Sequence, residues 1–173
     1  MSKSASAGFT MIELLVVVSI TVMLMMTVSV FFLTFIVGSN KAAFEQKVKH
    51  DGETALDQAA TMLRNARSIE TCATNMTSIS FTGQDNLTTT LTGASDRVAS
   101  VSAITTPATT FYLTSDYSLL TPTNSVIFDC YLGTNNQRYV DITFTLKKGT
   151  GTNNDQNTIS REFKTGVTIR NNF

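Results

Sequence analysis

The chain has 173 residues, of which 42% are hydrophobic and 15% are charged, and its 13 basic and 13 acidic residues cancel. A length of this order favours one globular domain with an appended segment over two full domains. The balanced charge, without a basic block, argues against direct nucleic-acid binding by this chain.

An uninterrupted apolar run covers residues 14–37, without charge, glycine or proline. About 24 residues in a helix span roughly 36 Å, enough to cross a bilayer core of about 30 Å. Hydroxyl side chains inside such a helix can return their hydrogen bonds to its carbonyls. The hydroxyl residues in the run are Ser19, Thr21, Thr27, Ser29 and Thr34. Because no second apolar run follows Gly38, we expect a single membrane span at residues 9–38.

The residues before this run do not follow the pattern of an ordinary secretory signal. Lys3 provides a basic start, but no A-x-A-like cleavage site follows the apolar core near Gly38. The core is also longer than the roughly 7–15 residues of a secretory signal. Small residues at positions 4–8 precede the core instead. A cut at that place would remove a short polar leader and leave the apolar helix on the mature protein.

The stretch GFTMIELL, residues 8–15, resembles the type IV prepilin signal of pilins, minor pilins and pseudopilins. The resemblance covers about residues 1–40. It implies a leader of residues 1–8, a prepilin peptidase that cuts after Gly8, and N-methylation of Phe9. The partners it implies are that peptidase, identical or related pilin subunits, an inner-membrane assembly platform and the lipid bilayer.

Glu13 is the only acidic residue before Glu45. A charge at the bilayer centre costs about 2.5–3.5 kcal/mol on insertion scales, and less near the edge. Once helices pack side by side in a filament, an unpaired carboxylate becomes expensive. The nearest cation is the amine that cleavage would create on Phe9, on the same chain or on a neighbour. We predict a Glu13–Phe9 charge pair that sets the axial register of subunits, as buried polar residues do in coiled coils. The alternative is an interfacial acid in a simple membrane anchor.

Residues 39–71 are predicted to continue the helix to about Ile69 as an amphipathic half. Apolar residues recur there at helical spacing. They are Phe44, Val48, Ala55, Leu56, Ala59, Met62, Leu63 and Ala66. Gly52 weakens the helix by up to about 1 kcal/mol and is a candidate position for a bend. The apolar stripe needs a partner surface, which a β-rich head at residues 72–173 would supply.

The head is predicted to contain antiparallel strands. Alternation of apolar and polar residues predicts strands at 140–147 and 163–170, joined as a hairpin by the polar loop 148–158. Further candidates are 125–132, 78–82 and 110–114. Residues 83–109, rich in Thr, Ser and Ala, read as loops or short edge strands. The expected fold class is α+β and type IV pilin-like, with one antiparallel sheet wrapped on the outer half of the helix.

Cys72 and Cys130 both lie beyond the apolar run. If this part is exported, their even number favours one disulfide, and the alternative is two unrelated buried thiols. A bridge would join the end of the helix to a strand in the middle of the sheet. It would close a loop of about 60 residues, worth roughly 4 kcal/mol in the chain-entropy model.

The sequence offers no catalytic, cofactor or metal motif: there is no Cys/His metal spacing, no P-loop and no Gly-x-Ser-x-Gly. Asn153, Asn154 and Asp155 provide only weak charge for calcium. The resemblance implies a structural subunit of a type IV pilus, type II secretion or DNA-uptake filament rather than an enzyme. Within this class, a sheet-rich head without a C-terminal cysteine loop favours a minor pilin or pseudopilin. It would reside in the bacterial inner membrane with its head outside the cytoplasm, and then in the filament. The alternatives are a major pilin and a single-pass anchored binding protein that does not polymerise.

Overall fold

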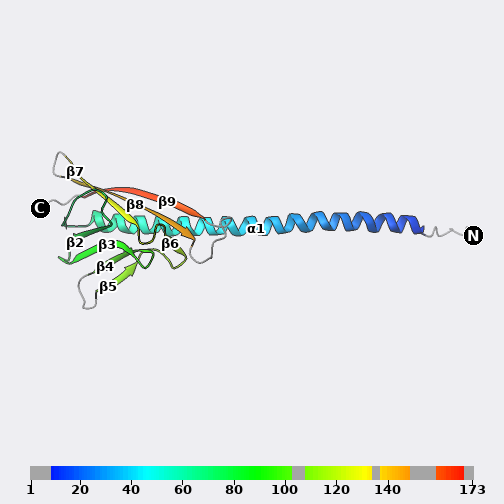
Figure 1. Cartoon of the computed structure of the whole chain (residues 1–173), viewed down its shortest axis with the longest axis horizontal. Helices are drawn as coiled ribbons and strands as arrows, with labels where there is room; N and C mark the ends of the chain where they lie inside the picture. Colours follow the sequence, from blue (N-terminus) through cyan, green and yellow to red (C-terminus); the bar gives the residue numbers. More distant parts are fainter. Residues whose placement is uncertain (1–8, 103–107, 134–136, 149–158, 170–173) are drawn as a thin grey trace, which may run out of the picture. The chain divides into compact units, whose positions relative to one another are not determined.

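The computed structural model describes residues 9–102, 108–133, 137–148 and 159–169. The chain divides into two units, residues 1–42 and 43–173. One helix, α1 (Met11–Arg64, 54 residues), contributes to both units (Figure 1).

In the first unit, every described side chain of α1 is exposed. This part of α1 contains a window of mean hydropathy 2.6. By length and composition, α1 is the one helix of the described residues that could cross a membrane. Its hydroxyls bond back to the helix as expected: Thr21 donates to the Val17 carbonyl at 2.7 Å and Ser29 to that of Met25 at 2.7 Å. The run thus buries no unpaired polar side chain if lipid or other helices surround it.

In the second unit, α1 presents an apolar stripe of mostly small residues to the head. The buried helix residues are Val48, Gly52, Ala55, Leu56, Ala59, Ala60 and Leu63. Their spacing of three and four places them on one face. Apart from Gly52, these residues belong to a single core cluster that also includes strand residues such as Leu91 and Ile142. The amphipathic half is therefore the centre of the head, and its small side chains let the strands approach closely.

In the described part of the chain, nine strands form two antiparallel sheets, where one sheet was expected. The first sheet has the order β1-β2-β3-β4-β5, with β1 Ser68–Ile69, β2 Ser78–Thr82, β3 Thr88–Ala94, β4 Arg97–Ser102 and β5 Thr109–Tyr112. The second contains β6 Ser118–Leu120, β7 Val126–Leu132, β8 Arg138–Lys148 and β9 Ser160–Ile169. In the view of Figure 1, β2–β5 lie on one side of the helical segment and β7–β9 on the other. Both sheets contribute to the core around α1.

Strand β8 is the centre of the second sheet. Along one edge it pairs first with β7 and then with β6, and along the other edge with β9. The register aligns buried residues across the three strands: Val140 of β8 faces Cys130 of β7 and Val167 of β9. Because side chains alternate with a period of two, this register buries the apolar set of each strand. The predicted strands at 125–132, 140–147 and 163–170 are confirmed.

Two expectations from the sequence are wrong in the first sheet. The helix was expected to reach Ile69, but it ends at Arg64 and Ile69 lies in β1. Pairing with β2 explains this: Arg67 N–H donates to the Thr82 carbonyl at 2.8 Å. Residues 83–109 were expected to be loops or short edge strands, but they include β3 and β4, which lie inside the sheet. Threonine and serine suit strands when their hydroxyls find partners on the neighbouring strand.

Candidate processing and assembly site

Thr10 is the N-cap of α1. Its carbonyl accepts hydrogen bonds from the backbone of Glu13 at 3.1 Å and of Leu14 at 3.2 Å. Its side-chain Oγ1 also accepts from the Glu13 N–H, at 3.4 Å. Thr10-x-x-Glu13 is the pattern of a capping box, in which the acid three residues into the helix reaches back towards the cap. This role of Thr10 was not predicted from the sequence, although the T-x-x-E spacing of residues 10–13 signals it.

Glu13 lies in the first turn of α1 and is exposed. A carboxylate is favoured there because the free N–H groups of the first turn carry partial positive charge. Among the described residues, none of the ion pairs involves Glu13. Phe9, 79% exposed, is joined to Gly8 in the full-length chain, so its nitrogen is still a peptide nitrogen. The Glu13–Phe9 pair therefore stays a prediction for the cleaved protein, and Gly8 itself lies outside the described residues.

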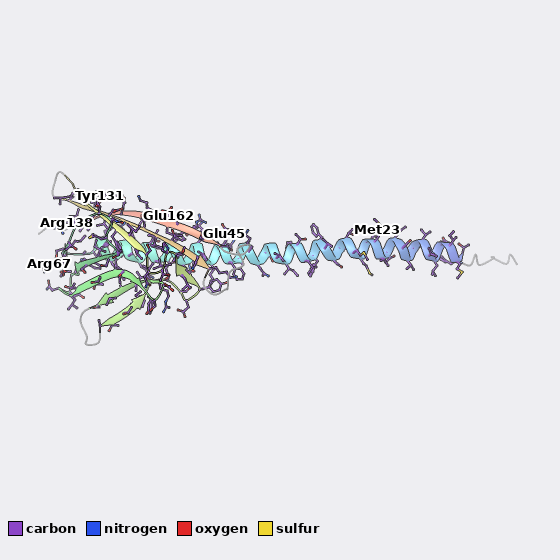
Figure 2. All side chains as sticks on the ribbon, viewed as in Figure 1. Met23, Glu45, Arg67, Tyr131, Arg138 and Glu162 are labelled. Carbon is purple, nitrogen blue, oxygen red and sulfur yellow. A yellow bond between two sulfur atoms is a disulfide. The ribbon has the colours of Figure 1, made fainter. Side chains whose placement is uncertain are left out.

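The apolar side chains that follow Glu13 have no cover within the described part of their own unit. Met23, labelled in Figure 2, is 72% exposed, and Phe31 is 77% exposed. Monomeric soluble proteins rarely expose apolar patches above a few hundred Å². A helix with this surface is stable in lipid or against other apolar helices.

Residues 3–29 match the family model described as the prokaryotic N-terminal methylation motif. The chain carries a type IV prepilin-like signal. The long apolar helix followed by antiparallel sheets fits the type IV pilin α+β fold. No curated protein and no solved structure matches the chain. The signal implies membrane anchoring, processing by a peptidase and assembly with other pilin subunits. These are the properties of a structural subunit.

The two cysteines form a disulfide, with their Cα atoms 5.0 Å apart and 58 residues apart in sequence. Cys72 was expected at the end of the helix, but it lies beyond β1, in the connection to β2. Cys130 lies in β7 of the second sheet. The bridge therefore joins the two sheets rather than the helix to a sheet.

Backbone hydrogen bonds reinforce this junction. Met76 and Phe128 exchange two of them, at 2.9 and 2.8 Å, and the Cys130 N–H donates to the Ala73 carbonyl at 2.9 Å. The Asn75 N–H donates to a carboxylate oxygen of Asp129 at 2.6 Å. The connection between β1 and β2 thus covers the outer edge of β7, which would otherwise offer unpaired backbone groups.

Asp51 of α1 accepts hydrogen bonds from two serines, one in the connection between β5 and β6 and one at the start of β6. The Ser118 hydroxyl, in a residue that is fully buried, donates to Asp51 Oδ2 at 2.7 Å, and the Ser115 hydroxyl donates to the same oxygen. Nearby, the Lys148 ammonium lies 3.9 Å from the centroid of the Phe44 ring. No local sequence pattern signals the role of Asp51, because its partners are distant in the chain.

The described residues contain no group of three or more His, Cys, Asp and Glu placed to hold a metal ion. The segment considered for calcium, Asn153–Asp155, lies outside the described residues.

Proposed function

We propose that this protein is a minor pilin or pseudopilin, a structural subunit of a type IV pilus, type II secretion or DNA-uptake filament. One coincidence carries the proposal: the methylation motif at residues 3–29 falls on a helix whose apolar side chains are uncovered. A processing signal followed by a helix that needs apolar neighbours suits a subunit that moves from lipid into a bundle of like helices.

The proposed route begins in the bacterial inner membrane, with residues 9–38 spanning the bilayer and the head outside the cytoplasm. Prepilin peptidase removes residues 1–8 by cutting after Gly8 and methylates the new amine of Phe9. The inner-membrane assembly platform then transfers the subunit into the filament. Van der Waals packing between the apolar helices stabilises the subunit there, because surface that leaves lipid gains little from the hydrophobic effect.

Glu13 supplies the register in this proposal. Its place in the first turn puts the carboxylate within about one helical turn of the amine that cleavage creates on Phe9. Between packed helices, an unpaired carboxylate or ammonium is costly, whereas a paired one is tolerated. A pair between the Glu13 of one subunit and the Phe9 amine of its neighbour would therefore favour one axial offset.

A minor rather than a major subunit is favoured by the position of the disulfide. The Cys72–Cys130 bridge joins the β1–β2 connection to β7, whereas many major pilins pin a C-terminal loop in this way. The other class of function is an anchored binding protein that does not polymerise, in which Glu13 is an interfacial acid.

The N-terminus of the mature protein tests the proposal. Mass spectrometry of protein purified from membranes should find a chain that begins at N-methylated Phe9. The Gly8→Val variant should keep its leader and run about 8 residues heavier, because a branched side chain does not fit a pocket shaped for glycine. Gly38→Val, at the other end of the span, is the matched control and should be processed normally. A wild-type protein that keeps Met1 would support the plain anchor instead.

A deletion strain identifies the machine. Loss of surface filaments, twitching, protein secretion or DNA uptake would each point to one filament system. A strain in which all four remain at the wild-type level would contradict the filament proposal.

A further inference from the structure

An open cleft of about 690 Å³ lies between the end of α1 and the first sheet. Met62 lines it from the last turns of α1, and Asn65 follows directly after the helix. Phe81 of β2 lines the opposite wall with Ser100 and Ser102 of β4. The cleft lies wholly within the second unit, and none of its lining residues belongs to the methylation motif.

The core-facing side of the first sheet carries polar side chains where it lines this cleft, whereas the rest of that side is apolar. Ile79 of β2 pairs with Leu91 of β3, and both are fully buried against the core. On β4, however, the core-facing positions after Val98 are Ser100 and Ser102. Ser100 is only 7% exposed. The core-facing side chains of β4 thus change from apolar to serine where the strand lines the cleft. Hydroxyl side chains at this position favour a polar ligand over an apolar one.

One of these hydroxyls has no partner. In the part of the chain that the structure describes, Ser102 Oγ is buried and makes no hydrogen bond. Leaving a buried hydroxyl unpaired costs about 1–3 kcal/mol, so such a group calls for an explanation. Ser102 lines the cleft, so a rotation of its side chain towards the open space would let a ligand hydroxyl supply the missing bond.

A carboxylate stands at the mouth of the cleft. Asp85 lies in the tight turn between β2 and β3, where its Oδ1 accepts a hydrogen bond from the Leu87 N–H at 3.1 Å. The Gly83 N–H closes the same turn by donating to the Leu87 carbonyl at 2.9 Å. The turn fixes the carboxylate in place, and a carboxylate can accept more than one hydrogen bond. Among the described residues, no lysine or arginine lines the cleft to balance its charge.

We propose that this cleft binds a neutral saccharide. Its volume falls in the range of about 300–1,000 Å³ that small-molecule sites have. The amide of Asn65, the carboxylate of Asp85 and the serine hydroxyls match the hydroxyl edges of a sugar ring. Met62, which is partly exposed, provides apolar surface for its C–H faces. The unbalanced carboxylate disfavours acidic and phosphorylated sugars. The proposal is independent of the assembly role of the helix.

Titration of the full-length protein with disaccharides tests this site. The protein is placed in phosphatidylcholine nanodiscs, because maltoside detergents would compete. Maltose, cellobiose, lactose and diacetylchitobiose are titrated and followed by saturation-transfer NMR and calorimetry. We expect at least one to bind, and 3′-sialyllactose to bind more weakly than lactose. Asn65→Ala and Asp85→Asn should each weaken the binding disaccharide about 10-fold, the loss of one good hydrogen bond.

Both variants are expected to fold, because Asn65 and Asp85 are exposed. In Asp85→Asn, the side-chain amide oxygen could still accept the hydrogen bond from the Leu87 N–H. Glu162→Gln, an exposed acid on β9 labelled in Figure 2, is the matched control and should bind like the wild type. The proposal is overturned if none of the four disaccharides binds at about 20 mM, where millimolar affinity is detected. It is equally overturned if both cleft variants bind as the wild type does.

Discussion

The ring of Phe163 in β9 occupies the space in front of Gly52 on α1. A Cβ atom built on Gly52 would lie 2.3 Å from Phe163 Cζ, far inside van der Waals contact. Phe163 is 5% exposed and stacks on Phe144 with ring centroids 5.7 Å apart, so the ring has little freedom to retreat. Gly52 is therefore the place where β9 packs against α1, and α1 continues through it to Arg64.

We expect Gly52→Ala to lower the free energy of unfolding of the head by about 1–3 kcal/mol, the usual cost of overpacking a core. Alanine gains up to about 1 kcal/mol in helix propensity, which does not offset a clash with a confined ring. Urea unfolding followed by near-UV circular dichroism measures the change. Gly38→Ala is the control, because nothing lies within 4 Å of a Cβ at that position.

The double variant Gly52→Ala with Phe163→Leu should recover part of the loss caused by Gly52→Ala, since the smaller side chain leaves room for the methyl group. A Gly52→Ala protein that is more stable than the wild type would mean that helix propensity outweighs the contact with Phe163.

Removal of the Cys72–Cys130 bridge should destabilise the head by about 4 kcal/mol, the chain-entropy value for a separation of 58 residues. Because only one bond is lost, Cys72→Ala and the double alanine variant should lose similar amounts. Urea midpoints under oxidising and reducing conditions measure this. The wild type should fall to the level of the variants on reduction, whereas the variants should not respond. A reducing agent that leaves the wild-type midpoint unchanged would show that the bridge does not stabilise the head.

Some parts of the structure follow from the sequence because one simple pattern decides them. The apolar run predicts the helix of the first unit, since in a single span only a helix pairs the backbone groups within the segment itself. Alternation in β7, β8 and β9 predicts these three strands of the second sheet, because each has one more buried and one more exposed face. The short strand β6 and the division into two sheets were not predicted. The first sheet carries a weaker signal: the core-facing residues of β4 include Ser100 and Ser102, so its alternation of apolar and polar residues is incomplete.

Most of the contacts that position the candidate sites cannot be predicted from a single sequence. Asp51 accepts from Ser118, 67 residues away, and no local pattern relates the two. The cleft beside Ser100 arises where α1 ends, and the helix was itself predicted to continue past Arg64 to Ile69. By contrast, the relation between Thr10 and Glu13 is local, so the spacing of a capping box would have been sufficient to predict it, although it was not predicted.

The pKa of the Tyr139 hydroxyl tests the contact between Tyr139 and Asp141 in the second sheet. A hydrogen bond with Asp141, and then the charge of that carboxylate, raise the pKa of Tyr139 above its ordinary 10.0. A raised pKa means that the folded state holds the proton more tightly than the unfolded state. The contribution to stability is thus complete below about pH 10 and is lost as pH rises through the folded-state pKa.

Ultraviolet titration of the phenolate band, with Tyr139→Phe as the reference, should place the pKa of Tyr139 above its ordinary 10.0 in the wild type. Asp141→Asn should bring the pKa back towards that value, because the repelling charge is gone. Glu162→Gln, on the neighbouring strand, is the control and should leave the titration unchanged. A Tyr139 that titrates at the same pH with and without the Asp141 carboxylate would contradict this assignment.

The role of Glu13 can be separated from the capping of α1. Glu13→Gln keeps a side chain that suits a capping box but removes the charge. Thr10→Ala keeps the charge but removes the cap hydroxyl, at a cost of about 1 kcal/mol to the helix. If Glu13 pairs with the Phe9 amine of a neighbour, the Gln variant should be inserted and cleaved but should not enter filaments. A broken buried pair costs about 3–5 kcal/mol, enough to exclude the subunit.

Membrane fractionation and immunoblotting of sheared filaments distinguish the two roles. Thr10→Ala should enter filaments at close to the wild-type level, because the proposed intersubunit pair is intact. Glu45→Gln is the matched charge control, since this exposed acid lies on the same helix beyond the apolar run. If Glu13→Gln is incorporated normally while Thr10→Ala is not, the acid serves to cap the helix, and the axial register of the subunits must come from apolar packing alone.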